Sequence, residues 1–261
     1  MASGSGTTDW AGRLAVVTGA ASGIGAAVAG ALAAHGCRVV AADIDLAGLE
    51  RLQSAIPAGA GEVIARRLDV ADWPAVDAAG REIVERYGAP HYLVPNAGIN
   101  PRVPSSGDVA EEFWDRVMGV NLKGLFATCR AFIPAMAEAG RGAVVNLGSV
   151  SGLIGWGGSS VYCASKGGVI ALTRALATEY AGRGVRVNCV CPGSVRTPMV
   201  LNNLARSGDV EAGLAASARQ HPLGRVAEAD EIADAILFLL GEQAAFMTGS
   251  ALVVDGGLTA V

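Results

Sequence analysis

The sequence has few charged and few aromatic side chains, at 17% and 5% of 261 residues, whereas hydrophobic residues make up 51%. This balance indicates a compact globule, and the chain is long enough for one large α/β domain or two small ones. The net charge is −4 and the chain contains no basic run, which argues against nucleic acid as a partner.

Long hydrophobic runs are also lacking. No apolar segment approaches the roughly 20 residues that span a bilayer, and the densest late run, residues 235–240, is short. The opening residues 1–9 have neither a basic region nor an apolar stretch of the kind found in signal peptides. We therefore expect a cytoplasmic protein without a membrane partner, with residues 1–10 as a disordered N-terminal extension.

Cysteines are few and irregularly spaced. The five are an odd number at spacings that suit neither a disulfide framework nor a zinc site, so we predict no metal. Cys189 and Cys191 are two residues apart in an expected strand, and they therefore share one face of it. Such a pair more often packs in a core than carries chemistry.

Glycine, in contrast, is abundant, and one cluster follows a short apolar run. The stretch T-G-A-A-S-G-I-G at residues 18–25 stands between an expected strand and an Ala-rich helix over residues 26–34. Glycines there let the backbone approach a phosphate, and the positive end of the helix favours a pyrophosphate. The stretch predicts a dinucleotide site, although by itself it also fits a plain strand-to-helix turn.

The rest of the chain alternates strands with helices, which predicts a doubly wound parallel sheet covered on both faces, in one α/β domain over residues 11–261. We expect a polar, mobile substrate loop at about residues 193–225. Further strands are expected at residues 37–43, 63–68, 91–95, 142–147, 185–191 and 251–254, and helices at residues 45–55, 72–87, 111–139, 160–180 and 228–240.

Asp43 ends the second expected strand. It follows the glycine stretch at close to the ~20-residue spacing at which an acid meets the adenosine ribose hydroxyls. The alternative is that it caps the N-terminus of the next helix.

Several motifs occur in order and are interleaved with the expected strands: the glycine stretch, N-A-G at residues 96–98, Ser149, Y-x-x-x-K at Tyr162 and Lys166, and P-G at residues 192–193. Together they resemble the short-chain dehydrogenase/reductase family over about residues 12–257. The resemblance implies a single Rossmann-type domain with a seven-stranded, mostly parallel sheet. One departure is Pro95, where many members carry asparagine; proline removes a donor from the sheet.

The residue types suit alcohol oxidation independently. A free tyrosine titrates near ~10, so Tyr162 is too weak an acid to serve as a base near neutral pH. A lysine about 4 Å away, at an effective dielectric near 20, contributes on the order of 4 kcal/mol, or roughly 3 pKa units, in favour of the tyrosinate. We therefore expect Lys166 to lower the pKa of Tyr162 and Ser149 to donate a hydrogen bond to the substrate oxygen. By resemblance, Asn121 bends its helix and holds a water that links Lys166 to solvent.

The resemblance also implies the cofactor contacts, on both sides of the crevice between the first and fourth strands. The expected cofactor-binding residues are Gly19, Ser22, Gly23, Ile24, Gly25, Asp43, Ile44, Asp69, Val70, Asn96, Ala97, Gly98, Tyr162, Lys166, Pro192, Gly193, Val195 and Thr197. Asp43 predicts NAD and not NADP, because a 2′-phosphate would meet a fixed anion without a nearby cation. Ser22 stands where NADP-using relatives often carry arginine or lysine.

These features predict an oxidoreductase that interconverts a secondary alcohol and a ketone with NAD(H). The alternatives are a 3-oxoacyl thioester (acyl-carrier-protein) reductase and a catalytically idle dinucleotide-binding scaffold or sensor. The family resemblance implies a homotetramer. Residues 152–156 are mostly apolar, which predicts a substrate with an apolar body, and Arg102 could anchor a carboxylate; alternatively, Trp156 only packs under its loop.

Overall fold

A computed structural model describes residues 8–103, 105–206 and 208–260 of the chain. Within them, seven strands form one sheet in the order β3-β2-β1-β4-β5-β6-β7, and every neighbouring pair is parallel. The predicted doubly wound sheet is therefore confirmed. The strands are β1 (Leu14–Thr18), β2 (Arg38–Asp43), β3 (Val63–Arg67), β4 (Tyr92–Pro95), β5 (Gly142–Leu147), β6 (Val185–Pro192) and β7 (Ala251–Val254).

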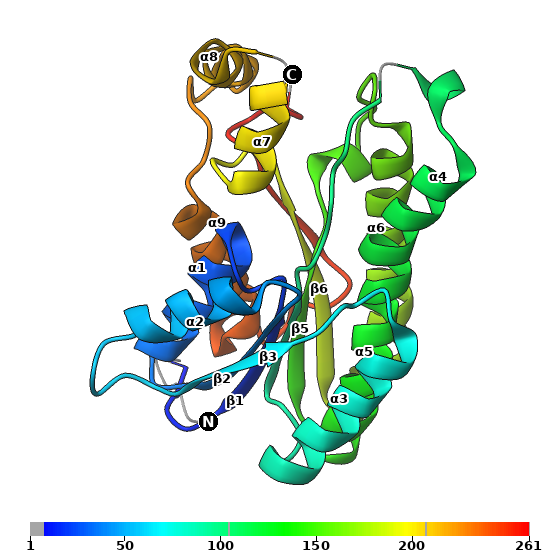
Figure 1. Cartoon of the computed structure of the whole chain (residues 1–261). Helices are drawn as coiled ribbons and strands as arrows, with labels where there is room; N and C mark the ends of the chain where they lie inside the picture. The colour runs from blue at the N-terminus through cyan, green and yellow to red at the C-terminus, as the bar shows by residue number, and fades with distance from the viewer. Residues whose placement is uncertain (1–7, 104, 207, 261) are drawn as a thin grey trace.

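Helices cover both faces of the sheet (Figure 1). One face carries α1 (Gly23–Ala34), α2 (Leu46–Ala55) and α9 (Ala229–Leu240). The other carries α3 (Trp73–Tyr87), α5 (Leu125–Glu138) and α6 (Ser160–Tyr180), with α4 (Glu111–Met118) packed along α6.

Strand residues alternate between the two layers, and side chains are buried in both layers. Val16 packs with the α3, α5 and α6 side, whereas Val17 packs with the α1 and α9 side. This double burial explains why the strands are apolar runs and not alternating patterns.

Aspartates start several helices. The Asp45 carboxylate accepts from the backbone N–H of Gly48 at the start of α2, and Asp72 accepts from Ala75 at the start of α3. Each bond satisfies one of the N–H groups that a helix start leaves without a partner. The N-cap of α2 is thus Asp45, so Asp43 is not the cap of that helix.

The long segment around Asn121 is interrupted by a π-helical turn over Gly119–Gly124, which separates α4 from α5. The Asn121 side chain is fully buried there, and its amide bonds both the N–H and the carbonyl of Ile99, each at 2.8 Å. The amide also donates to the Ser165 hydroxyl. The expected irregularity at Asn121 is confirmed, and it fastens the segment after β4 to α6.

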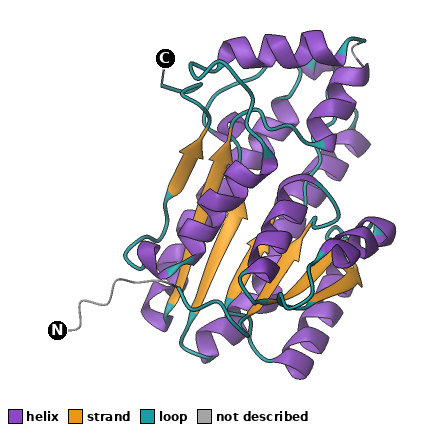
Figure 2. Ribbon diagram, turned by 90° about the vertical axis from the view of Figure 1, so that its left-hand side faces the viewer, coloured by secondary structure: helices purple, strands orange, loops and turns teal. Residues whose placement is uncertain are grey.

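The expected mobile stretch contains two helices, α7 (Pro198–Arg206) and α8 (Val210–Gln220), which lie above the carboxyl ends of the strands (Figure 2). Pro198 is the first residue of α7, a position that proline favours, and Asp209 caps α8 by accepting from the Ala212 N–H. Leu214 buries its side chain beneath them. No described helix is both long and apolar enough to cross a membrane.

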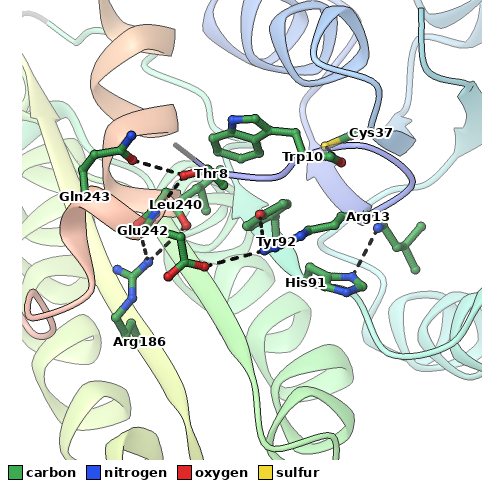
Figure 3. Close-up of polar contacts among 12 residues, drawn as sticks. Thr8, Trp10, Arg13, Cys37, His91, Tyr92, Arg186, Leu240, Glu242 and Gln243 are labelled. Carbon is green, nitrogen blue, oxygen red and sulfur yellow. Dashed lines mark hydrogen bonds and ion pairs between the residues drawn. The ribbon is translucent and has the colours of Figure 1, made fainter. Parts of the chain in front are cut away.

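Polar side chains at the amino-terminal edge of the sheet form a connected cluster (Figure 3). Arg13 donates to the Tyr92 hydroxyl at 3.0 Å and lies 3.7 Å from the Glu242 carboxylate. The Arg186 guanidinium donates to four backbone carbonyls, those of Leu239, Leu240, Gly241 and Met247. Three of these carbonyls belong to the end of α9 and the residue after it, so Arg186 supplies partners for groups that a helix end leaves unbonded.

The chain before β1 is held by the same cluster. Thr8 contacts Gln243 and the Glu242 N–H, and the Trp10 ring lies 4.8 Å from the Tyr92 ring. Residues 1–7 of the expected N-terminal extension lie outside the described residues. Thr8 and Trp10, the last part of the expected extension that the structure describes, therefore contact the body of the fold.

Candidate active site

A cavity of about 550 Å³ opens at the carboxyl-terminal edge of the sheet. Its walls come from the loops after β1, β4, β5 and β6, from the end of β2, and from parts of α6, α7 and α8. This is the edge at which the strand order reverses between β1 and β4, as predicted. The size is typical of a site for a cofactor or small ligand.

The glycine stretch forms one wall. Gly19 and Gly23 have φ of +65° and +54°, a region that favours glycine. A Cβ on Gly25 would lie 2.0 Å from the Gly19 carbonyl oxygen, so only glycine fits there. The Asn96 amide donates to the carbonyls of Thr18 and Gly19, and so joins the loops after β1 and β4. These residues leave room for a phosphate at the start of α1, as a dinucleotide needs.

Pro95 does not break the sheet. The pairing of β4 with β1 runs as far as Thr18 opposite Pro95, whereas its pairing with β5 covers only Tyr92 and Leu93. Beyond the proline, the Thr18 hydroxyl accepts from the N–H groups of Asn96 and Ala97. The Thr18 side chain thus replaces the backbone acceptors that the sheet no longer provides beyond Pro95.

Asp43 lies at the end of β2 and lines the cavity. Its carboxylate accepts from the N–H of Ala21 and from the N–H of Asp45, both at 3.0 Å. These two bonds hold the carboxylate beside the glycine stretch. Ile44, next in the chain, is 63% exposed and presents an apolar surface at this end of the site.

Most of the predicted site residues line the same cavity. Those that do not are Gly25, Ile44, Asp69, Val70 and Asn121. Gly25 and Asn121 act through packing and hydrogen bonds next to the cavity wall, and the Asp69 carboxylate accepts from the Ala71 N–H. The residues brought together are Gly19, Ser22, Gly23, Ile24, Asp43, Asn96, Ala97, Gly98, Ser149, Tyr162, Lys166, Pro192, Gly193, Val195 and Thr197.

Ser149, Tyr162 and Lys166 meet in the deeper part of the cavity. Tyr162 and Lys166 are one turn apart on α6, and the Lys166 Nζ lies 5.7 Å from the centre of the Tyr162 ring. Lys166 is 2% exposed and donates to the Leu147 carbonyl at 2.7 Å. Ser149 follows β5, and its hydroxyl accepts from the Ser151 N–H.

Burial has the largest effect on the pKa of Tyr162 and on that of Lys166. It raises the pKa of Tyr162 to about 12, against the opposing effect of a hydrogen bond with Ser149. Burial also lowers the pKa of Lys166 to about 8. The expectation that Lys166 brings the pKa of Tyr162 down is therefore not met in this structure, because the enclosed site penalises each charged form and the ammonium is bonded to a carbonyl.

Sequence reasoning missed His221, which is 3% exposed at the end of α8. Its Nε2 accepts from the Ser194 N–H at 3.1 Å, so Nδ1 carries the proton and donates to the Ser217 carbonyl at 2.8 Å. His221 thus ties the loop after β6 to α8, on the rim of the cavity. No local pattern marks it, because both contacts depend on a helix that was not expected.

Cys189 and Cys191 are buried beneath the same site, with their sulfur atoms 3.8 Å apart. A Cβ on Gly148 would lie 2.6 Å from the Cys189 sulfur, so the pair packs directly under the residue before Ser149. The expectation that they belong to the core is confirmed.

Comparisons with known proteins agree with this geometry. Residues 19–259 match the family model described as Enoyl-(Acyl carrier protein) reductase. The chain is 41% identical over 252 residues to 2-(R)-hydroxypropyl-CoM dehydrogenase of Xanthobacter autotrophicus, covering 95% of this chain and 99% of that one. It is 39% identical over 249 residues to a 3-oxoacyl-[acyl-carrier-protein] reductase of Thermotoga maritima, covering 95% and 98%.

A solved structure shows the same architecture. The crystal structure of levodione reductase superimposes with a TM-score of 0.92 at 34% identity, covering 95% of this chain and 98% of that one. Such likeness over nearly the whole length extends to the parallel sheet and to the elements that carry Ser149, Tyr162 and Lys166. The chain therefore belongs to the short-chain dehydrogenase/reductase family, and it is an oxidoreductase that acts on CH–OH groups.

Proposed function

We propose that the protein interconverts a secondary alcohol and its ketone with NAD(H). The observation that carries this proposal is the meeting of Ser149, Tyr162 and Lys166 at one end of a cavity whose other end holds the glycine stretch and Asp43. A nicotinamide dinucleotide, when bound, supplies the hydride acceptor or donor. The relatives whose names describe alcohol dehydrogenases and ketone reductases support the same pairing of substrate and product.

The proton chemistry belongs to the protein itself. In ketone reduction, the Tyr162 phenol donates its proton to the carbonyl oxygen, and the Ser149 hydroxyl hydrogen-bonds that oxygen as negative charge develops on it. In alcohol oxidation, the phenolate takes the hydroxyl proton. Because burial raises the pKa of Tyr162 to about 12, the phenol is the dominant form at neutral pH in this structure. The phenolate needs nearby positive charge, and Lys166 is the cation on the same helix face.

Asn121 is proposed to serve the proton path by positioning. Its amide fixes Ile99 and Ser165, and its Oδ1 would lie 3.4 Å from a Cβ on Gly98, where Lys166 Nζ would lie 3.6 Å away. Asn121 and Lys166 thus border the same small space behind the N-A-G turn. A water held there would link Lys166 to solvent.

NAD is the proposed cofactor. The carboxylate of Asp43 is held in place by two N–H groups and lines the cavity where the adenosine ribose is expected. A 2′-phosphate would bring further negative charge against it. Ser22 in the glycine stretch and the exposed Ile44 offer that phosphate no cation.

The direct test is steady-state kinetics on a panel of secondary alcohols, polyols, steroids and hydroxyacyl thioesters, with NAD and NADP compared for each. We expect activity with at least one secondary alcohol and at least a tenfold higher kcat/KM with NAD, a difference of about 1.4 kcal/mol. Equal or better efficiency with NADP would show that Asp43 does not face the ribose.

A 3-oxoacyl thioester reductase is the second candidate, because the matching family model and one relative carry acyl-carrier-protein reductase names. A marked preference for a 3-oxoacyl thioester and NADPH in the same panel would favour it. An idle scaffold or sensor would bind dinucleotide and turn over none of the panel.

We propose a homotetramer in the cytoplasm. Several large apolar side chains are exposed near the last strand and on α4: Phe246 is fully exposed, and Trp114, Phe238 and Val253 are each more than one-third exposed. Contact with other copies would cover them. Light scattering at micromolar concentration should give a mass near four chains, and a monomer mass would contradict the proposal; fractionation of cells checks the location.

A further inference from the structure

The substrate end of the cavity contains polar atoms that the proposed chemistry does not use. Ser159 is the N-cap residue of α6, one turn before Tyr162, and it is only 4% exposed. Its Oγ is buried, bonds no N–H group of the helix and has no hydrogen-bond partner among the described residues. Buried hydroxyls are rarely left without a partner. A ligand that binds in this cavity can supply one.

Helix α6 itself favours negative charge at this place. It has 21 residues, and its first N–H groups have no partner within the helix. Their partial positive charge is directed at the Ser159 end, which lines the cavity. The helix start and the Ser159 hydroxyl can therefore both donate to an oxygen anion.

Arg102 adds a full positive charge to this end of the cavity. Its side chain lines the cavity, and it forms no ion pair or hydrogen bond with any described residue. The other lining cation, Lys166, is bonded to the Leu147 carbonyl at the catalytic end. Asp43, the acidic lining residue, is held by backbone N–H groups at the end of β2. No described carboxylate offsets Arg102 at the substrate end.

The segment that carries Arg102 is fastened on three sides. Ile99 is bonded to Asn121, the Asn100 carbonyl accepts from the Asn203 amide of α7 at 2.8 Å, and the Val103 N–H donates to the Gly158 carbonyl at 3.2 Å. Gly158 immediately precedes Ser159, so this last bond places the Arg102 segment beside the start of α6. The arginine and the unpartnered hydroxyl therefore border the same end of the cavity.

Resting on the proposed function, we infer that this end binds a carboxylate carried by the substrate away from its reacting hydroxyl. The substrate class is a hydroxy acid whose body is apolar, because Trp156, Met199 and Leu204 line the same cavity as the polar groups. Arg102 and the Ser159 hydroxyl donate to the carboxylate, and Tyr162 and Ser149 meet the hydroxyl at the other end. A neutral polyol would also satisfy Ser159, but it would leave Arg102 without a function.

The experiment compares hydroxy acids with their own amides, which match them in shape and lack the charge. The holoenzyme is assayed with 3-hydroxybutyrate, 4-hydroxypentanoate and 4-hydroxycyclohexanecarboxylate, each beside its amide, and with cyclohexanol. At least one acid should exceed its amide about tenfold in kcat/KM, and added salt should reduce this ratio because Arg102 is exposed. If no acid exceeds its amide, or if a polyol exceeds every acid, the inference is wrong.

Variants assign the effect to residues. Arg102→Gln should remove most of the acid preference by raising KM for the acid about tenfold, with a much smaller change in kcat/KM for its amide. Ser159→Ala should lower kcat/KM for the acid about threefold to tenfold with little change in thermal midpoint. Arg183→Gln, at an exposed arginine after α6 and outside the cavity, is the matched control. It should leave the ratio of kcat/KM for the acid to that for its amide unchanged. If Arg102→Gln lowers kcat/KM equally for the acid and its amide, the proposed contact between Arg102 and the carboxylate is contradicted.

Binding without turnover separates this inference from the proposed function. Calorimetric titration of the NADH-bound enzyme with cyclohexanecarboxylate, which has no hydroxyl to oxidise, should show binding that Arg102→Gln weakens about tenfold and that the amide does not reproduce. If alcohols are oxidised but cyclohexanecarboxylate binds no better than its amide, the proposed function stands and the carboxylate site does not. If none of the alcohols is oxidised but this binding pattern is found, the carboxylate site stands and the proposed function does not.

Discussion

At the amino-terminal edge of the sheet, Arg13 bonds the Tyr92 hydroxyl and pairs with Glu242, and the Arg186 guanidinium satisfies four carbonyls (Figure 3). At the carboxyl-terminal edge, the Ser159 hydroxyl and the Arg102 guanidinium have no partner among the described residues. Both edges are built by the same seven parallel strands. They differ in whether the polar groups find their partners within the chain.

The difference separates stability from function. A polar group that is fully bonded by its own protein contributes to the folded state and has little left to offer a ligand. A buried group without a partner costs stability, and such groups concentrate where a ligand completes them. Variants at the two edges should therefore change different measurements.

The largest effect is expected from replacing a tyrosine by phenylalanine at the carboxyl-terminal edge. Tyr162→Phe removes the proton donor and little volume, so kcat should fall by ~10²–10⁴ while dinucleotide binding and the thermal midpoint are retained. Single-turnover kinetics and cofactor titration measure the two quantities. Near-normal turnover in this variant would rule out Tyr162 as the acid.

Tyr92→Phe is the matched control at the amino-terminal edge. The variant loses the bond from Arg13, and Tyr92 does not line the cavity, so the substitution should cost about 1 kcal/mol of stability and leave kcat unchanged. A fall in kcat of more than tenfold would show that the two edges are coupled.

Arg186→Met should give the largest loss of stability without loss of chemistry. The substitution keeps an apolar stem and leaves the carbonyls at the end of α9 without their donor, which should cost about 2–4 kcal/mol. Thermal unfolding should show a midpoint lower by roughly 4–16 °C, at ~2–4 °C per kcal/mol for a chain of this size. Activity per folded molecule should be retained, and an unchanged midpoint would contradict the structural role.

Asp43→Ala tests the ribose end of the carboxyl-terminal edge. It removes a carboxylate that the Ala21 and Asp45 N–H groups hold at the cavity wall, so the preference for NAD over NADP should narrow by about tenfold, chiefly through weaker NAD binding. The ratio of kcat/KM values for the two cofactors measures this change. Asp45→Ala, which removes only the cap of α2, should leave the ratio unchanged.

The smallest effect is a pH dependence at the amino-terminal edge. Burial lowers the pKa of His91 from 6.5 to about 4, with Arg141 and Arg13 acting in the same direction, and its Nδ1 accepts from the Leu14 N–H. Between pH 6.5 and 4 the unfolded chain binds a proton that the folded chain does not, so stability should fall as the pH falls through this window. Since His91 is only half-buried, the loss is on the order of 1 kcal/mol.

His91→Asn keeps an acceptor at this position and removes the titration. The decline of the thermal midpoint between pH 6.5 and 4 should therefore be shallower in this variant than in the natural protein. If the midpoint declines equally in both proteins, groups other than His91 cause the decline.

Prediction from sequence succeeded where one local signal was strong. The bounds of β5 and α6 agree with those expected, because an apolar run and a long helical pattern are each closed by glycine, proline or polar residues. The helices α7 and α8 were missed: each is short, and few of their described residues are buried. Such helices are stabilised by what they cover and not by their own pattern.

In the candidate site, too, the residues that belong to local patterns were predicted, whereas contacts between distant segments were not. Glycines that only a close approach can explain, an acid at a strand end and Y-x-x-x-K on one helix face are local patterns, and they placed Gly19, Asp43, Tyr162 and Lys166 correctly in one cavity. The contacts of His221 with Ser194 and Ser217 join separate segments, and so does the bond from Val103 to Gly158. No motif or residue spacing in the sequence predicts these contacts.

The sequence by itself determined the parallel sheet and which residues are candidates for the cofactor crevice and for catalysis, because each depends on a local periodicity or on a short motif at a strand end. The tertiary structure decided which polar groups remain without partners, that burial and not Lys166 dominates the pKa of Tyr162, and that the segment of Arg102 is bonded to the residue before Ser159. These properties depend on which segments meet and on how much water they exclude. Desolvation and hydrogen bonding act through space, so they are fixed only when the chain has folded.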